Sequence, residues 1–203
     1  MAEAIYDLEC HTEERENVHK EEHADRPREP EGRRRRGRHA SAVHGAPVNV
    51  ALRPMEDHDL DTIFEQTTDA EAVRMAAFTS ENQFDRGAFL DRMSRIRADQ
   101  AVWHRVIEVD GAVAGTIGSF HMDNRREVTY WIDRRQWGNG IASAALQLLL
   151  AEIDERPIYG RAASDNAGSL RVLEKAGFRR VGVDRGYAPG RGEEIEETIL
   201  RLD

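Results

Sequence analysis

From residue 48 onward, the spacing of apolar residues alternates between the period of a strand and that of a helix. VNVALRP (48–54) alternates small apolar and polar residues and stops at a proline, which is typical of a first strand. Segments 56–69 and 85–100 carry apolar residues three and four positions apart. This spacing predicts two helices after the first strand.

Residues 101–133 predict three consecutive strands. Asp110-Gly111 divides residues 101–122 into two strands, because this dipeptide favours the type I′ turn of a tight hairpin. VTYWID (128–133) is rich in β-branched and aromatic residues, which predicts the next strand.

The last third of the chain predicts two more helices and three strands. The first helix follows Gly140 and ends before Pro157, and its inward face is expected to carry Ile141, Ala145, Leu148, Leu149 and Ile153. The remaining elements are a strand at 157–163, a helix at 164–177 with Gly177 as its cap, and strands at 178–185 and 193–202. The order β-α-α-β-β-β-α-β-α-β-β predicts a mixed α/β fold with helices on both faces of one sheet.

Residues 1–47 lack this pattern. Between Asp7 and Ala40 the main apolar residue is Val18, so too little surface can be buried to offset the entropy of ordering. We expect a disordered charged tail over 1–47 and one domain over 48–203. The arginine run at 33–38 could contact nucleic acid or anionic lipid, but the acidic residues before it nearly cancel its charge, which favours a solvated linker.

The overall charge argues against polyanionic partners. The 203 residues include 29 basic and 38 acidic side chains, so the net charge is −9 and nucleic acid is not an expected partner. No apolar run is long enough to span a membrane, and the first residues lack the order of a signal peptide. We therefore expect a cytoplasmic protein without a membrane partner.

The single cysteine, Cys10, excludes an intramolecular disulfide and a metal site built from cysteines alone. His19 and His23 are four residues apart, with His11 nearby, and could share a helical face as metal ligands. Because nothing predicts a stable helix there, we expect no metal site.

A glycine-containing loop, DRRQWGNGIASAALQLLL (133–150), leads from the fourth strand into a helix. It is not a dinucleotide fingerprint, since Ser143 stands where the third glycine belongs, and it lacks the lysine of a P-loop. Backbone N–H groups at the helix N-terminus could instead bind a phosphate, with Arg134 or Arg135 adding a charged contact. The alternative is an ordinary turn into a packed helix.

Two motifs resemble the acetyl-CoA motifs of the GNAT N-acetyltransferase superfamily. RQWGNGIA (135–142) resembles the pyrophosphate motif R/Q-x-x-G-x-G/A, and NAGSLRVLEKAGF (166–178) resembles the second motif, N-x-x-S-x-x-x-x-E-K-x-G-F. The resemblance extends over residues 48–203. YWI (130–132) and RGE (191–193) are most similar to the branch that includes the ribosomal-protein alanine N-acetyltransferases.

This resemblance implies a GNAT-like fold. Its central twisted sheet is mostly antiparallel, with helices on both faces and a splay between strands four and five. In the family the fourth strand carries a bulge, and the pantetheine arm of the co-substrate inserts in the splay like an extra strand. Backbone N–H groups freed there can hold the thioester oxygen as it gains charge.

The resemblance also implies which residues contact acetyl-CoA. They are Trp131, Ile132, Arg135, Gln136, Trp137, Gly138, Asn139, Gly140, Ile141, Ala142, Asn166 and Ser169. Gly138 and Gly140 stand where a side chain would block the pyrophosphate. Asn166 would bind the pantetheine arm, although it could instead cap the following helix, a role open also to Ser164 or Asp165.

The implied reaction is direct attack of a neutral amine on the acetyl thioester. Glu127, on the fourth strand, is the candidate general base, acting directly or through water. The alternative is a solvent-facing glutamate beside two arginines. His121 and Asp123 are substitutes for it, and His104 is a weaker candidate.

One position departs from the family pattern. Leu173 stands where many members place a tyrosine acid, so another group must assist the leaving thiolate. Ser169 is the candidate, and a weak donor would suffice because a thiol of pKa about 8.5 is already a fair leaving group. The alternative for Ser169 is a small packed residue or a hydroxyl bonded back to its helix.

The acceptor amine stays open among three interpretations. An α-amino group at a protein N-terminus predicts an open groove, and a small-molecule amine or antibiotic predicts a closed pocket. A non-catalytic acetyl-CoA-binding protein predicts binding without turnover. Segments 78–84 and 187–193 are expected to shape the acceptor site, and a homodimer is possible in this family.

Overall fold

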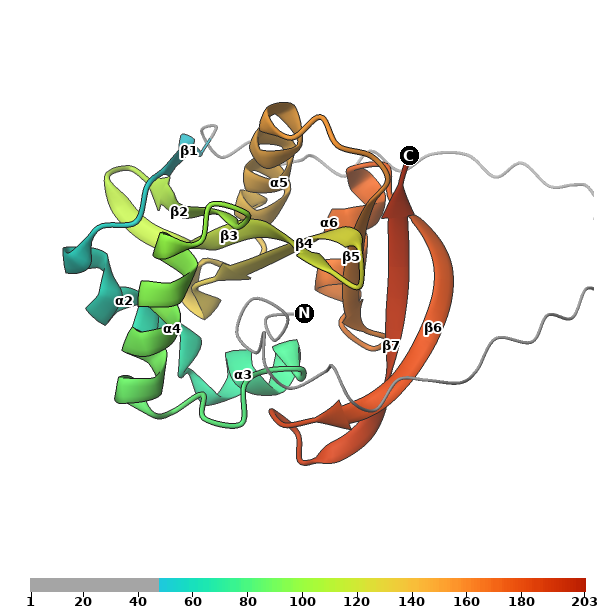
Figure 1. Ribbon diagram of the computed structural model, residues 1–203, viewed down its shortest axis with the longest axis horizontal. Helices are drawn as coiled ribbons and strands as arrows, with labels where there is room; N and C mark the ends of the chain where they lie inside the picture. The colour runs from blue at the N-terminus through green and yellow to red at the C-terminus, as the bar shows by residue number, and fades with distance from the viewer. Residues whose placement is uncertain (1–47) are drawn as a thin grey trace, which may run out of the picture.

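The computed structural model describes residues 48–203, which form a seven-stranded sheet with helices on both faces (Figure 1). The strand order is β1-β2-β3-β4-β5-β7-β6, and neighbouring strands are antiparallel except for the parallel pair β4 and β5. The predicted mixed α/β fold is thereby confirmed. The predicted tail, with its arginine run and its cysteine and histidines, lies outside the described residues.

The elements follow the predicted order closely. The strands are β1 (Val50–Arg53), β2 (Trp103–Val109), β3 (Ala112–Met122), β4 (Arg125–Ile132), β5 (Ile158–Ala163), β6 (Arg179–Ala188) and β7 (Glu193–Leu202). The helices are α2 (Leu60–Thr67), α3 (Ala70–Ala76), α4 (Arg86–Ala98), α5 (Ile141–Glu152) and α6 (Ala167–Lys175), with short 3-10 turns η1 (Asp57–Asp59) and η2 (Arg134–Gln136).

The prediction of only two helices between the first two strands is wrong, because α3 lies between α2 and α4. The seven residues AEAVRMA are too few to show a clear helical period. Asp69 nevertheless gives a local signal, since its side chain caps α3 by accepting hydrogen bonds from the N–H groups of Glu71 and Ala72.

Two turns have the predicted conformations. Asp110 and Gly111 both have positive φ angles, 51° and 80°, as a type I′ hairpin requires. Gly177 has a φ of 96° just after α6, where a left-handed residue ends the helix. Both predictions are confirmed.

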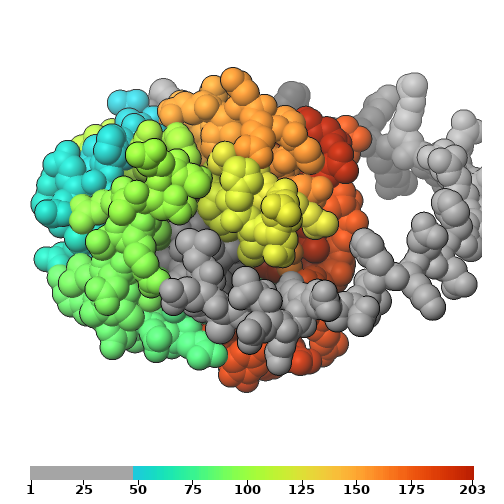
Figure 2. All heavy atoms as spheres, in the orientation of Figure 1, coloured from blue at the N-terminus to red at the C-terminus, as the bar shows by residue number. Residues whose placement is uncertain are grey.

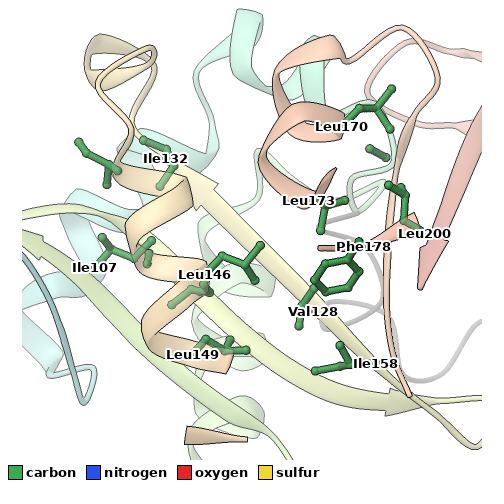
Figure 3. Packing of buried hydrophobic residues seen from close by; sticks show 14 of the residues in the cluster. Ile107, Val128, Ile132, Leu146, Leu149, Ile158, Leu170, Leu173, Phe178 and Leu200 are labelled. Carbon is green, nitrogen blue, oxygen red and sulfur yellow. The ribbon is translucent and has the colours of Figure 1, made fainter. Parts of the chain in front are cut away.

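One face of the sheet is covered by α5 and α6. Their apolar side chains gather over β4 and β5, together with Val128, Ile158 and Phe178 (Figure 3). Leu146 is fully buried here, whereas Leu148, which we expected to face inward, is 40% exposed. The buried stripe of α5 is thus rotated toward Leu146.

The opposite face is covered by α2, α3 and α4. Their apolar residues pack against Val106, Phe120 and Trp131 of the sheet. The indole Nε1 of Trp131 also donates a hydrogen bond of 3.0 Å to the carbonyl oxygen of Gln66. This bond ties the end of β4 to α2.

Candidate active site

The principal cleft lies where β4 and β5 diverge. Their parallel pairing covers only Arg126–Val128 and Ile158–Gly160, although β4 continues to Ile132 and β5 to Ala163. The cleft has a volume of about 600 Å³. Its lining includes Trp131, Ile132, Gln136, Trp137, Gly138, Gly140, Ile141, Ala142, Asn166 and Ser169, all of which were predicted from the sequence.

The splay does not depend on a bulge in β4, and that expectation is corrected. Residues 115–122 of β3 pair with 125–132 of β4 in an uninterrupted register. The irregularity lies instead between β2 and β3, where pairing skips Ala114. Gly115 permits the close approach of β4, since a Cβ atom there would stand 2.0 Å from the carbonyl oxygen of Trp131.

The glycine loop forms the mouth of the cleft. Gly138 and Gly140 have left-handed φ angles of 81° and 79°, which side chains disfavour. Gly140 is the N-terminal boundary of α5, so the first amide groups of the helix, at residues 141–143, have no partner within it. Because the helix dipole adds to these donors, the geometry suits a phosphate group.

The two loop arginines are turned to carboxylates rather than to the cleft. Arg134 binds Asp69 with an N–O distance of 2.8 Å, and Arg135 binds Asp133 at the same distance. Arg134, Arg135 and Asn139 are exposed and do not line the cleft, unlike the other predicted residues of the loop. These ion pairs offset the positive charge that Arg134 and Arg135 could offer to an anion.

The facing walls come from α3 and α6. Ala72, Met75 and Ala76 of α3 line the cleft and were missed because that helix was not predicted. Arg171 and Lys175 of α6 also line it. Their four-residue spacing within the second motif places both cations on one helical face and could have revealed them.

Asn166 caps α6, as its alternative interpretation expected. Its side-chain oxygen accepts a hydrogen bond of 3.0 Å from the N–H of Ser169. Its amide nitrogen donates to the carbonyl oxygen of Met75 at 3.2 Å, which connects α6 to α3 across the cleft. The cap therefore also forms part of the wall.

Two hydroxyl groups meet inside the cleft. The Oη of Tyr130 lies 2.7 Å from the Oγ of Ser169. Leu173, where many relatives carry a tyrosine, is fully buried against Gly160, at which a Cβ atom would stand 2.7 Å from a Leu173 methyl carbon. A hydroxyl is thus supplied from β4 rather than from position 173.

Glu127 is buried, with 3% of its surface exposed, so the interpretation of a solvent-facing glutamate is wrong. It lies within the paired part of β4 and β5, opposite Tyr159 and one residue before the splay begins, and it is not part of the cleft lining. It is on the same face of β4 as Trp131, because alternate residues of a strand share a face. Burial raises the pKa of Glu127 to about 7, although Arg161 nearby lowers it, and Glu197 raises it further. This pKa suits a group that exchanges a proton near neutral pH.

The substitute bases lie elsewhere. His121 belongs to the opposite face of β3 from Phe120, the partner of Glu127, and its Nε2 is 2.8 Å from Glu155. Asp123 sits in the turn after β3 with a φ of 50°. Burial lowers the pKa of His104, in β2, to about 4, which keeps its ring neutral.

The predicted acceptor segments come together at the tip of the β6–β7 hairpin. The N–H of Gly190 donates to the carbonyl oxygen of Ala77 at 2.8 Å. Arg191 binds both oxygens of Asp165, at 2.7 and 2.8 Å, and donates to the carbonyl oxygen of Arg74. The hairpin therefore contacts the segment after α3. In Figure 2 the two lie next to each other along the lower edge of the molecule.

Two broader properties concern the described residues only. Within 48–203, no helix combines the length and the apolar character needed to cross a membrane. In the same range, histidine, cysteine and acidic side chains do not gather in groups of three that could hold a metal ion.

Comparison with known proteins agrees with this geometry. Residues 49–179 match the family described as Acetyltransferase (GNAT) domain. The chain is 24% identical over 163 residues to the N-acetyltransferase p20 of Bacillus licheniformis, covering 75% of this chain and 92% of that protein.

Solved structures share the fold. RimJ of Mycobacterium smegmatis, in complex with CoA-disulfide, superposes with a TM-score of 0.65 at 22% identity, covering 75% of this chain and 81% of that one. Spermidine N-acetyltransferase of Vibrio cholerae, in complex with CoA and spermine, gives a TM-score of 0.61 at 18% identity, covering 75% and 95%. At these identities the likeness shows the fold alone.

Proposed function

The chain belongs to the GNAT acetyltransferase family and is an acetyl-CoA-dependent N-acetyltransferase, and we propose that its acceptor is the α-amino group of a protein N-terminus. The catalytic unit in this proposal is residues 48–203. The observation that carries it is the buried carboxyl group of Glu127, whose pKa is about 7.

A base of this strength matches an α-amine better than a lysine. At pH 7, deprotonating an α-amino group of pKa about 7.8 costs about 1.1 kcal/mol, whereas a lysine of pKa about 10.4 costs about 4.6 kcal/mol. Glu127 would accept the proton of the ammonium group, directly or through water. The neighbouring Glu197 is already paired with Arg161, at 2.6 Å, so its charge is largely offset and the proposal rests on Glu127.

The cleft fits acetyl-CoA, which supplies the acetyl group as a reactive thioester when bound. The free amides of α5 would hold the pyrophosphate, and Gly138 and Gly140 would let it approach. Arg171 and Lys175 would add positive charge on the facing wall. Beyond Val128 β4 no longer pairs with β5, and the backbone of residues 130–132 would face the pantetheine arm and the thioester oxygen there.

A small-molecule amine is the second candidate acceptor. The β6–β7 hairpin binds Asp165, which lines the cleft, and contacts the segment after α3, so it limits the space beside the cleft, which suits a compact substrate. A homodimer remains a prediction, and so does the affiliation with the ribosomal-protein branch that includes RimJ.

The test measures thiol release from acetyl-CoA, corrected for hydrolysis without acceptor. One well receives peptides with free N-termini and no lysine, and another receives small amines including spermidine. We expect release with the peptides. Release only with small amines would replace the proposed acceptor class. Silence in both wells, while acetyl-CoA still raises the melting temperature, would leave either a non-catalytic binding protein or an acceptor outside both panels.

A further inference from the structure

The hydroxyl of Tyr130 contacts two oxygen atoms of one residue. Its Oη lies 2.7 Å from the Oγ of Ser169 and 3.2 Å from the carbonyl oxygen of Ser169. Both residues line the cleft, Tyr130 from β4 and Ser169 from the first turn of α6. The contact between Tyr130 and Ser169 therefore joins β4 to α6 inside the cleft.

These distances allow two arrangements of the two hydroxyl protons. In the first, Tyr130 donates to the carbonyl oxygen and Ser169 donates to Tyr130, so neither proton points into the cleft. In the second, Tyr130 donates to the Oγ of Ser169, and the serine proton is free to point into the cleft. A negative charge in the cleft favours the second arrangement, because hydrogen bonds to charged acceptors are about twice as strong as neutral ones.

We propose that Tyr130 is a positioning residue that donates to the Oγ of Ser169 and so directs the serine proton at the sulfur atom of the departing CoA thiolate. The inference rests on the acetyltransferase function proposed above. Many family members have a tyrosine acid at the position of Leu173. In this protein, the proposal assigns assistance to the leaving thiolate to Tyr130 of β4 and Ser169 of α6 instead. Within this pair, only Ser169 would touch the reacting sulfur.

The chemical step balances without proton loss from either hydroxyl. The amine nitrogen bonds to the acetyl carbon, and the carbon–sulfur bond breaks with its electron pair on sulfur. The proton of the amine leaves to Glu127 or to water. Ser169 and Tyr130 only donate hydrogen bonds, which stabilise the thiolate as it forms.

The environment keeps Tyr130 available as a donor. Burial raises the pKa of Tyr130 above its ordinary value, and the hydrogen bond to Ser169 lowers it by less. The phenol therefore stays protonated throughout the neutral range. A phenol is also a better donor than an aliphatic hydroxyl, since it is the more acidic group, with a pKa of about 10 in water.

The first experiment measures binding rather than turnover. Calorimetry gives the dissociation constants of CoA and of desulfo-CoA, which lacks the sulfur, on either side of the thiol pKa of about 8.5. If the serine proton meets the sulfur, the preference of the wild-type protein for CoA should rise about tenfold with pH, which corresponds to a thiol pKa lowered by about one unit. Ser169→Ala should abolish this rise, and Tyr130→Phe should reduce it to below about threefold.

The second experiment separates positioning from packing. Tyr130→Phe should lower kcat about tenfold, of the order lost with one hydrogen bond to a charged group, and leave the KM for acetyl-CoA within twofold. Adding Ser169→Ala to Tyr130→Phe should lower kcat no further than Ser169→Ala alone, because the two act as one unit. Tyr159→Phe, a change of the same kind on β5 outside the cleft lining, should leave the KM for acetyl-CoA and the pH-dependent preference for CoA within twofold of the wild-type values.

Distinct results would overturn the inference and the proposed function. If the preference of Tyr130→Phe for CoA over desulfo-CoA rises with pH as much as that of the wild type, and the wild-type protein turns over an acceptor, the inference is overturned and the proposed function stands. If Tyr130→Phe does not fold, a wild-type-like pH response in Ser169→Ala would overturn it equally. A wild-type protein that neither binds CoA nor releases thiol with any acceptor would overturn both.

Discussion

At the scale of single residues, Glu127 connects burial with protonation. Its carboxyl group titrates near pH 7 because its burial outweighs the attraction of Arg161. As a general base it must be deprotonated, so kcat/KM should fall below pH 7. Glu127→Gln should lower kcat/KM by roughly 10²–10⁴-fold, the usual contribution of such a group, and remove the inflection near pH 7 while leaving that of the acceptor α-amine near pH about 7.8. Initial rates of thiol release from about pH 5.5 to 9 check both effects.

The same pKa gives a second readout that does not depend on the acceptor. The folded protein holds a proton on Glu127 up to about pH 7, whereas the unfolded chain releases it near the ordinary value of 4.5. Stability should therefore fall as the pH rises between these two values. The free energy of unfolding of Glu127→Gln should not fall in this way. Its difference from the wild-type value should therefore shift in favour of the variant by up to about 3 kcal/mol between low pH and pH above 7. A constant difference in unfolding free energy across this range would contradict the burial of a titrating carboxyl group.

At the scale of elements, the turn from β4 into α5 depends on its two left-handed glycines. A Cβ atom at Gly138 would meet no other atom within 4 Å, so an alanine there is opposed by backbone conformation rather than by a clash. Such a conformation costs about 1–2 kcal/mol for a residue with a side chain. Gly138→Ala should relieve that strain by shifting the loop, which moves the amides of α5 away from their phosphate-binding positions. We expect acetyl-CoA to bind about tenfold more weakly by calorimetry, a loss of about 1.4 kcal/mol.

A matched glycine is available on β6. Gly182 also has open space at its Cβ position, and its φ lies outside the left-handed range. Gly182→Ala should leave the affinity for acetyl-CoA unchanged. Equal affinities for the two variants and the wild type would mean that the loop does not bind the phosphates.

At the scale of the whole molecule, the sequence predicted the fold because its signals are local. The Asp110-Gly111 turn, the cap at Gly177 and the spacing of the two motifs each depend on a few neighbouring residues. The raised pKa of Glu127 depends on its burial and on charges from other strands, those of Arg161 and Glu197, so no local pattern could predict it.

The same limit applies to the contacts of the cleft. The contact between Tyr130 and Ser169 joins residues 39 positions apart in the sequence. It depends on how α6 packs beside β4, which no local pattern specifies. Helix α3 was missed for a different reason, since its seven residues show little periodicity and much of its burial comes from packing on α2 and the sheet.

Arg191 connects distant parts of the molecule, because it joins the β6–β7 hairpin to the carbonyl oxygen of Arg74 in α3 and to Asp165, which precedes α6. Its side chain is only 11% exposed. Arg191→Met keeps most of the apolar stem and removes the charged hydrogen bonds, which should destabilise the protein by about 1–3 kcal/mol. For a domain of this size, that loss lowers the melting temperature by roughly 2–10 °C.

Since α3 and α6 form facing walls of the cleft, the same change should also weaken acetyl-CoA binding, by about threefold, as the walls become less well fixed. Arg180→Met is the matched control, because Arg180 lies on β6 of the same hairpin, has a side chain that is 57% exposed, and pairs with the exposed Glu174. An exposed pair of this kind contributes less than about 1 kcal/mol, so the control should retain both the melting temperature and the affinity. Loss of stability in Arg191→Met without any loss of affinity would show that the hairpin supports the fold but does not shape the cleft.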